Sequence, residues 1–141
     1  MDLNKIASKL TEDETILILI DHLKSEGWNI DGHCLGQQRG YDIEASKENE
    51  KLFIEAKGAK GNDHSPTTKR KYFDSGQIKD HFGKAIVKSL ETINSHPNAK
   101  IGIAHPDDED IRRVIGGITK NVTKLGITHY WVNENNITIE Q

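Results

Sequence analysis

Two short segments near the middle of the chain, YDIEA at residues 41–45 and KLFIEAK at residues 51–57, alternate apolar and charged residues, with one interruption at Phe53. An alternation with a period of two is typical of β-strands, because successive side chains point to opposite faces of a sheet. The polar stretch SKENE between them has the length of a hairpin connection. These features predict a β-hairpin that any fold of this chain must accommodate.

The predicted hairpin has one aliphatic face and one charged face. Its aliphatic residues, which can pack on a core, are Ile43, Ala45, Leu52, Ile54 and Ala56. The opposite face carries Asp42 and Glu44 on the first strand and Glu55 and Lys57 on the second. We expect Asp42, Glu55 and Lys57 to meet across the hairpin if the strands pair in the appropriate register.

Helical patterns precede the hairpin and alternate with strands after it. A short helical pattern covers residues 2–10, and TEDE at 11–14 is a capping-box sequence that predicts a helix ending near Gly27. A strand interrupted by a glycine is predicted over 28–35. After the hairpin we expect a helix, a strand, a helix loosened by two glycines and two strands, at residues 76–97, 99–106, 107–127, 128–133 and 136–140. This order predicts a single α/β domain, residues 1–141, with a mixed sheet flanked by helices.

Composition excludes several classes of protein. The chain has 141 residues, which suffices for one domain. Its longest apolar run, Ile16 to Ile20, is far shorter than the roughly 20 residues that a membrane helix needs. The single cysteine, Cys34, excludes an internal disulfide framework and a cysteine-rich zinc site. With no secretory signal at the start of the sequence, we expect a cytoplasmic protein that does not enter a membrane.

Charge is distributed unevenly along the chain. The formal net charge is −3, which argues against a protein that coats nucleic acid with its whole surface. The stretch from Lys57 to Tyr72 nevertheless holds five basic residues and one acid. Residues 58–76 lack periodicity and are predicted to form a flexible basic loop. Such a loop suits a polyanionic partner, although a solvated loop without a partner would explain it equally well.

The charged face of the hairpin has a chemical interpretation. Two carboxylates that converge on one point repel each other, so a cation or water must lie between them. Oxygen ligands of this kind suit Mg²⁺, for which Mn²⁺ can substitute, and both ions bind phosphate oxygens. A lysine two residues after the glutamate can stabilise a developing anion or hold an attacking water. Together, Asp42, Glu55 and Lys57 suit metal-assisted phosphodiester hydrolysis.

Asp42, followed after twelve intervening residues by EAK at 55–57, resembles the motif of the PD-(D/E)xK nuclease superfamily. The local sequence GYDIEA…LFIEAKG is similar to sequences of its restriction-endonuclease-like and Holliday-junction-resolvase-like branches. The predicted elements between Glu12 and Ile103 also follow the order of the αβββαβ core of that family. The chain departs from the family pattern at Gly40–Tyr41, where no proline precedes the aspartate.

The resemblance implies specific roles for these residues. Asp42, Glu55 and the main-chain carbonyl of Ala56 would hold the metal, and Lys57 would serve the attacking water. Related nucleases often place a glutamate on the first core helix, which makes Glu14 a candidate. Alternatively, Glu14 is the capping-box partner of Thr11. Glu12 is a weaker candidate for the same role near the metal.

Other polar residues are secondary candidates. Gln77 opens the second predicted helix, where several branches of the family carry a glutamine beside the active site. Glu44 and His81 are better explained as exposed residues. Contacts with nucleic-acid phosphates are expected from six residues, Lys60, Lys69, Arg70, Lys71, Lys84 and Lys88. A solvated helix face explains Lys84 and Lys88 equally well.

The first hypothesis is a Mg²⁺-dependent endonuclease that acts on DNA rather than RNA. A domain of this size could dimerise to cut both strands or act as a subunit of a larger complex. The alternative is a non-catalytic nucleic-acid-binding or assembly module on the same fold, since a fold does not determine a function. A third interpretation treats the acids as decoration of a solvated sheet face.

Overall fold

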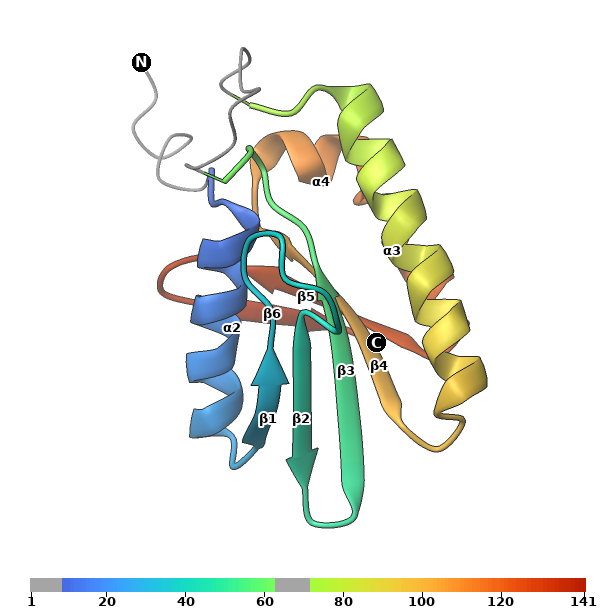
Figure 1. The fold of residues 1–141 in the computed structure, drawn as a ribbon. Helices are drawn as coiled ribbons and strands as arrows, with labels where there is room; N and C mark the ends of the chain where they lie inside the picture. Colours follow the sequence, from blue (N-terminus) through green and yellow to red (C-terminus); the bar gives the residue numbers. More distant parts are fainter. Residues whose placement is uncertain (1–8, 63–71) are drawn as a thin grey trace.

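A six-stranded mixed sheet, in the order β1-β2-β3-β4-β5-β6, forms the centre of the computed structural model (Figure 1). The structure describes residues 9–62 and 72–141, so the helix predicted at 2–10 lies almost entirely outside the described residues. The described strands are β1 (Asn29–His33), β2 (Ile43–Lys47), β3 (Glu50–Ala56), β4 (Lys100–Pro106), β5 (Ile127–Val132) and β6 (Ile137–Glu140). The described helices are α2 (Glu12–Ser25), α3 (Ser75–Ser95), α4 (Glu109–Ile115) and α5 (Thr119–Thr123).

Helices cover both faces of this sheet. Strands β3, β4 and β5 pair in parallel, and β1, β2 and β6 extend the sheet in antiparallel pairs. Figure 1 shows α2 on one face and α3 on the other. On strand β3, Leu52 and Ile54 pack in the core beneath α2, whereas Phe53 packs in the core beneath α3. The predicted α/β class with a mixed sheet is therefore confirmed, and the described elements from α2 to β4 run helix, three strands, helix, strand.

Helix α2 begins and ends where its sequence predicts. The Thr11 hydroxyl accepts a hydrogen bond from the Glu14 amide at 3.1 Å, and the Glu14 carboxylate accepts one from the Thr11 amide at 2.9 Å. This is the reciprocal capping box that satisfies two free donors at a helix start. The chain turns after the helix at Gly27, whose φ of 92° is accessible to glycine at little cost.

The hairpin turn is tighter than predicted. Strand β2 continues to Lys47 and β3 begins at Glu50, so the polar residues of the expected connection mostly belong to the strands. Polar side chains hold these strand ends, because Asp31 on β1 accepts hydrogen bonds from Ser46 and Lys51. Cross-strand polar contacts of this kind stabilise an exposed part of a sheet.

The helix predicted over residues 107–127 is two short helices. The chain leaves α4 at Gly116, where an added Cβ would clash with the carbonyl oxygen of Arg112. It resumes as α5 at Thr119, and the two glycines therefore separate the helices rather than merely loosening one. In the described part of the chain, no helix combines the length and the apolar character required to cross a membrane.

Candidate metal and active site

The register of the β2–β3 hairpin brings the two predicted acidic ligands together. Ile43 pairs with Ile54, so the next position along each strand places Asp42 opposite Glu55. Residues opposite each other in an antiparallel pair project from the same face. The Asp42 carboxylate is also fixed in place, because its Oδ2 accepts a hydrogen bond from the Ala56 amide at 2.8 Å. This register agrees with the expected pairing of Asp42 with Glu55, whereas the expected meeting of Lys57 with the two acids stays a prediction.

Glu55 is a buried acid, with 7% of the residue exposed. It projects from the same face of β3 as Phe53, the face covered by α3. The Lys88 ammonium, on α3, lies 3.0 Å from Glu55 Oε1. That oxygen accepts no well-directed hydrogen bond within the described part of the chain. An acid on a solvated sheet face would be exposed, so that interpretation is wrong for Glu55.

A third acid, Glu12, comes from the first turn of α2. Directly after β3, Gly58 packs so closely on the helix start that an added Cβ would lie 2.5 Å from the Glu12 amide nitrogen. The Ala59 amide then donates a hydrogen bond to the Leu10 carbonyl at 2.8 Å. These contacts bring the half-buried Glu12 into electrostatic contact with Asp42 and Glu55.

The preference for Glu14 over Glu12 requires a correction. Glu14 is exposed, and its carboxylate is engaged with the Thr11 amide in the capping box. Glu12 lies one residue into the helix and on the side that meets the segment after β3. The sequence favoured Glu14, but the packing of Gly58 against the helix start makes Glu12 the better candidate.

Burial and mutual repulsion perturb these acids. Loss of hydration and then the Asp42 carboxylate raise the pKa of Glu55 from 4.5 to about 7, against the opposing effect of Lys88. Burial and the Asp42 carboxylate likewise raise the pKa of Glu12 from 4.5 to about 7, and the Lys57 ammonium acts in the opposite direction. A raised acid pKa means that the ionised form lacks sufficient compensation from its surroundings. The cluster therefore favours an added positive charge.

Lys57, the residue after β3, lies within electrostatic range of Glu12 on α2 and His81 on α3. Its amide donates a hydrogen bond to the Ala104 carbonyl at 2.9 Å, which fixes the backbone between β3 and β4. Its positive charge acts on Glu12, and burial followed by Lys57 and Lys84 lowers the pKa of His81. His81 is half-buried and its ring contacts Phe73 at 4.6 Å between centroids, so it is less exposed than predicted.

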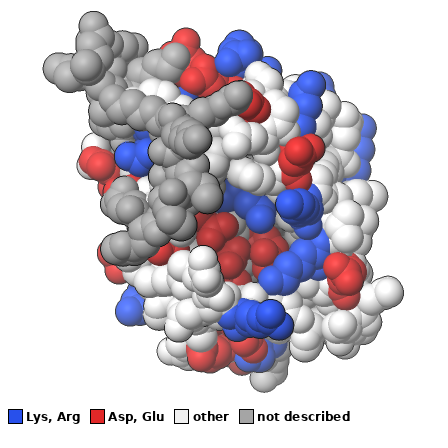
Figure 2. Space-filling model, turned by 45° about the horizontal axis from the view of Figure 1, so that its top comes forward, with Lys and Arg blue, Asp and Glu red and all other residues white. Residues whose placement is uncertain are grey.

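The donor set fits a hard divalent cation only with help from other oxygens. Within residues 9–62 and 72–141, no three histidine, cysteine or acidic side chains are gathered closely enough to hold a metal ion by themselves. Figure 2 shows acidic side chains in a recess bordered by lysine and arginine side chains. The Asp42–Glu55 pair, with a main-chain carbonyl and waters, suits Mg²⁺, which keeps several waters when bound to one or two carboxylates.

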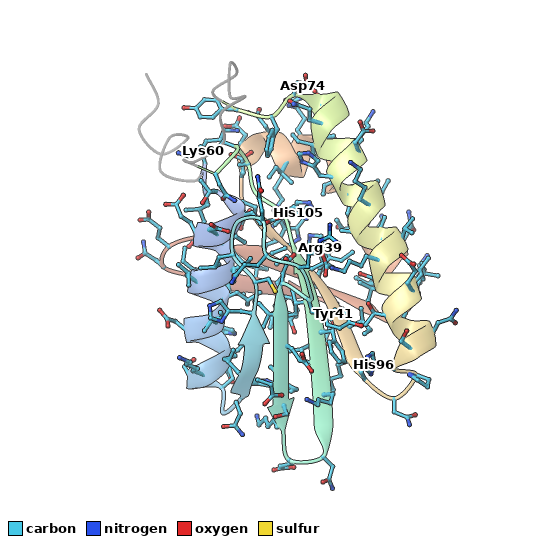
Figure 3. The ribbon with its side chains drawn as sticks, in the orientation of Figure 1. Arg39, Tyr41, Lys60, Asp74, His96 and His105 are labelled. Atoms are coloured by element: carbon cyan, nitrogen blue, oxygen red, sulfur yellow. The ribbon has the colours of Figure 1, made fainter. Side chains whose placement is uncertain are left out.

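The remaining predicted residues are placed as follows. Gln77 forms the capping box of α3, where its side chain accepts from the Asp74 amide at 3.0 Å, so its amide serves the helix start. Lys60 forms an isolated bridge with Thr11 near the start of α2 (Figure 3), and Lys84 is exposed on α3. Glu44 lies 3.6 Å from Lys51 on the half-exposed part of the hairpin. The basic residues Lys69, Arg70 and Lys71 lie outside the described residues.

Two contacts in this region could not be predicted from the sequence. One is the contact of Lys88 with Glu55, which joins a helix to a strand. The other is a buried histidine pair behind α3, where His105 Nδ1 and His129 Nε2 are 3.1 Å apart. Burial lowers the pKa of His105 well below its usual value and that of His129 to about 4, so both rings are neutral at pH 7.

No protein-family model matches the sequence, and neither a curated protein nor a solved structure matches it. The function of the chain is therefore inferred from its own residues and geometry. The observations that matter most are the facing carboxylates of Asp42 and Glu55 and the lysines beside them.

We predict that the acid cluster makes metal-free folding stability fall with rising pH. Because the pKa of Glu55 is about 7 when folded and 4.5 otherwise, the folded state holds a proton that the unfolded state has released between these values. Stability from this group is complete below about pH 4.5 and is lost as the pH rises to about 7. Glu55→Gln should therefore raise the free energy of unfolding at pH 8 by about 2 kcal/mol.

The measurement is urea unfolding in the presence of a chelator at pH 4.5 and pH 8. The gain from Glu55→Gln should be small at the lower pH, where the wild-type carboxyl is protonated when folded. A variant less stable than the wild type at pH 8 would show that Lys88 fully compensates the buried charge.

Proposed function

We propose that this protein is a Mg²⁺-dependent endonuclease of the PD-(D/E)xK type that hydrolyses phosphodiester bonds in DNA. The observation that carries the proposal is the hairpin register, which places Asp42 and Glu55 opposite each other on one face. Lys57 follows Glu55 by two positions, as the motif requires. The order of the described elements from α2 to β4 is compatible with the αβββαβ core of a restriction-endonuclease-like fold.

Each residue of the cluster has a separate role in this proposal. Asp42, Glu55 and the carbonyl of Ala56 would hold Mg²⁺, and Glu12 adds a third carboxylate that can act through a water. Bound metal supplies positive charge that acidifies water and offsets charge on the phosphate. The raised pKa of Glu55 and of Glu12 supports this assignment, because burial and the Asp42 carboxylate outweigh the effect of the neighbouring lysine at each acid.

Lys57 orients the attacking water and stabilises the anion that develops at phosphorus. The water oxygen forms a new bond to phosphorus as the bond to the 3′ oxygen breaks. One proton leaves the water and one is taken up by the departing 3′ oxygen, so the products carry a 5′-phosphate and a 3′-hydroxyl. The hydrogen bond that the Lys57 amide donates to the Ala104 carbonyl supports this role, because it fixes the backbone from which the ammonium extends.

DNA would lie across the lysine-rich border of the acidic recess. The exposed Lys84 on α3 and the half-buried Lys60 beside α2 are suitable phosphate contacts. Phosphate contacts from Lys69, Arg70 and Lys71, which lie outside the described residues, are proposed from the sequence alone. Contacts of this kind bind any sequence and weaken with salt. A domain of this size would need a second copy or a partner subunit to cut both strands.

The decisive experiment compares Glu55→Gln with a matched change at the other end of the same strand, Glu50→Gln. Single-stranded and double-stranded DNA and RNA are incubated with each protein in Mg²⁺, Mn²⁺ or chelator. Wild type and Glu50→Gln should cut DNA only with metal, because Glu50 is 53% exposed and paired with Lys100. Glu55→Gln should be inactive, and equal cleavage by all three proteins would refute the site.

One observation favours the alternative of a non-catalytic nucleic-acid-binding module. Lys88 already lies 3.0 Å from Glu55, so the buried acid has a protein counter-ion. A structural ion pair of this kind needs no metal. Binding of DNA that is insensitive to chelator, together with no cleavage in either metal, would support this alternative.

A further inference from the structure

The Lys88 side chain crosses from α3 to the hairpin and ends in a site suited to a cation. Its Nζ lies 3.0 Å from Glu55 Oε1 and donates a hydrogen bond to the Gly40 carbonyl at 2.9 Å. The same nitrogen is 5.6 Å from the centre of the Tyr41 ring, and Figure 3 shows Tyr41 beside β3 on the side of α3. A carboxylate, a carbonyl and an aromatic ring all attract positive charge.

We propose that Lys88 is a tethered cation that competes with the divalent metal for Glu55 and is displaced when the metal binds. This inference rests on the proposed function, because it assumes that the metal uses the Glu55 carboxylate. The inference goes beyond the phosphate contact expected of Lys88, because it gives this residue a role in the protein without bound DNA. Lys88 thereby sets the metal concentration at which the site fills.

Competition follows from the confined position of the carboxylate. The Glu55 side chain is 9% exposed, so a metal that binds it must enter the space beside Lys88. An ammonium and a divalent ion on one carboxylate repel each other strongly where water is scarce. The lysine therefore has to move before the metal can bind at full strength.

The helix allows this movement without rearrangement of the fold. The Lys88 side chain is 42% exposed, so its end can turn into solvent. Its neighbour Ser89 and the residue one turn earlier, Ala85, are each 1% exposed and keep α3 in place. A flexible four-carbon chain can thus release Glu55 while the helix stays packed. The released ammonium lies at the border of the recess, where it can contact a substrate phosphate.

The test measures Mn²⁺ binding to the metal-free protein by calorimetry, without nucleic acid. Lys88→Met should bind Mn²⁺ about tenfold more tightly than the wild type, because the competing charge is gone. Lys88→Gln, whose amide can still donate to the Gly40 carbonyl, should show the same gain and controls for loss of that contact. Lys79→Met, on the exposed side of the same helix, should bind Mn²⁺ as the wild type does.

Wild-type or weaker Mn²⁺ affinity in both Lys88 variants would overturn the competition. Failure of the proposed function gives a different result. In that case Glu55→Gln binds Mn²⁺ as tightly as the wild type does. If only the Lys88 variants bind Mn²⁺, the competition is supported in its strongest form. If no variant binds Mn²⁺, both proposals fall. Circular dichroism of each variant verifies that the comparison is made between folded proteins.

Discussion

Asp42→Asn is expected to lower the rate of Mg²⁺-dependent DNA cleavage by about a thousandfold while leaving the hairpin folded. Asparagine can still accept the hydrogen bond that the Ala56 amide gives to Asp42 at 2.8 Å, so the local structure loses little. The substitution removes the charge that the metal needs on this side of the site. A thousandfold loss corresponds to about 4 kcal/mol of transition-state stabilisation, which is a reasonable contribution for a metal ligand.

The measurement is the single-turnover cleavage rate at saturating protein, with Mn²⁺ affinity measured in parallel. Asp31→Asn is the matched control, because Asp31 lies on the same sheet and contacts Lys51 and Ser46 away from the site. The control should cut at the wild-type rate. Cleavage by Asp42→Asn at that rate would remove Asp42 from the mechanism, even if other residues of the cluster proved essential.

The second large effect is expected at Gly58, where alanine should destabilise the protein by about 2 kcal/mol. An added Cβ would lie 2.5 Å from the Glu12 amide nitrogen, 2.9 Å from the Thr11 carbonyl carbon and 3.0 Å from the Lys60 carbonyl oxygen. All three atoms belong to the backbone, so no side chain can turn away to relieve the clash. The segment after β3 must therefore separate from the start of α2.

Urea unfolding measures this loss, and Gly83→Ala provides the matched control. A Cβ at Gly83 meets nothing within 4 Å, and this glycine lies inside α3. Alanine there should stabilise the protein by roughly 0.5–1 kcal/mol, as expected for a helix interior. Equal stability of Gly58→Ala and the wild type would show that the contact with α2 yields easily. In that event Glu12 would not be held beside Asp42 by packing.

Gly58→Ala should also lower the rate of DNA cleavage. Displacement of the helix start moves Glu12 away from Asp42, so cleavage should fall even where the protein remains folded. Glu14 is engaged with Thr11 and moves with its own cap, which gives it no route to the acid pair. The variant therefore tests whether packing of Gly58 against the start of α2 is needed for cleavage.

Local sequence patterns predict most of this fold. The alternation in residues 41–57 and the capping box at Thr11 depend only on neighbouring residues, and both features are present as predicted. The patterns place element ends less well, because tertiary contacts decide them. The hairpin extends to Lys47 and Glu50 through contacts with β1, and the glycines after α4 divide one predicted helix into two.

The acidic pair of the site was also within reach of the sequence. Asp42 and Glu55 share a face because strand alternation and a tight hairpin leave no other arrangement once Ile43 and Ile54 face the core. Burial of that face beneath α3 was not predictable, since the segment from 41 to 57 says nothing of what covers it. For this reason the raised pKa of Glu55 could not be foreseen.

Periodicity and hairpin geometry by themselves determined the α/β class and the meeting of two carboxylates. The tertiary structure alone decided that Glu12 lies within electrostatic range of them and that Lys88 contacts Glu55. The physical reason is the range of the interactions involved. Alternation, capping and turns act between residues a few positions apart, whereas burial and ion pairing depend on surfaces that only packing brings into contact.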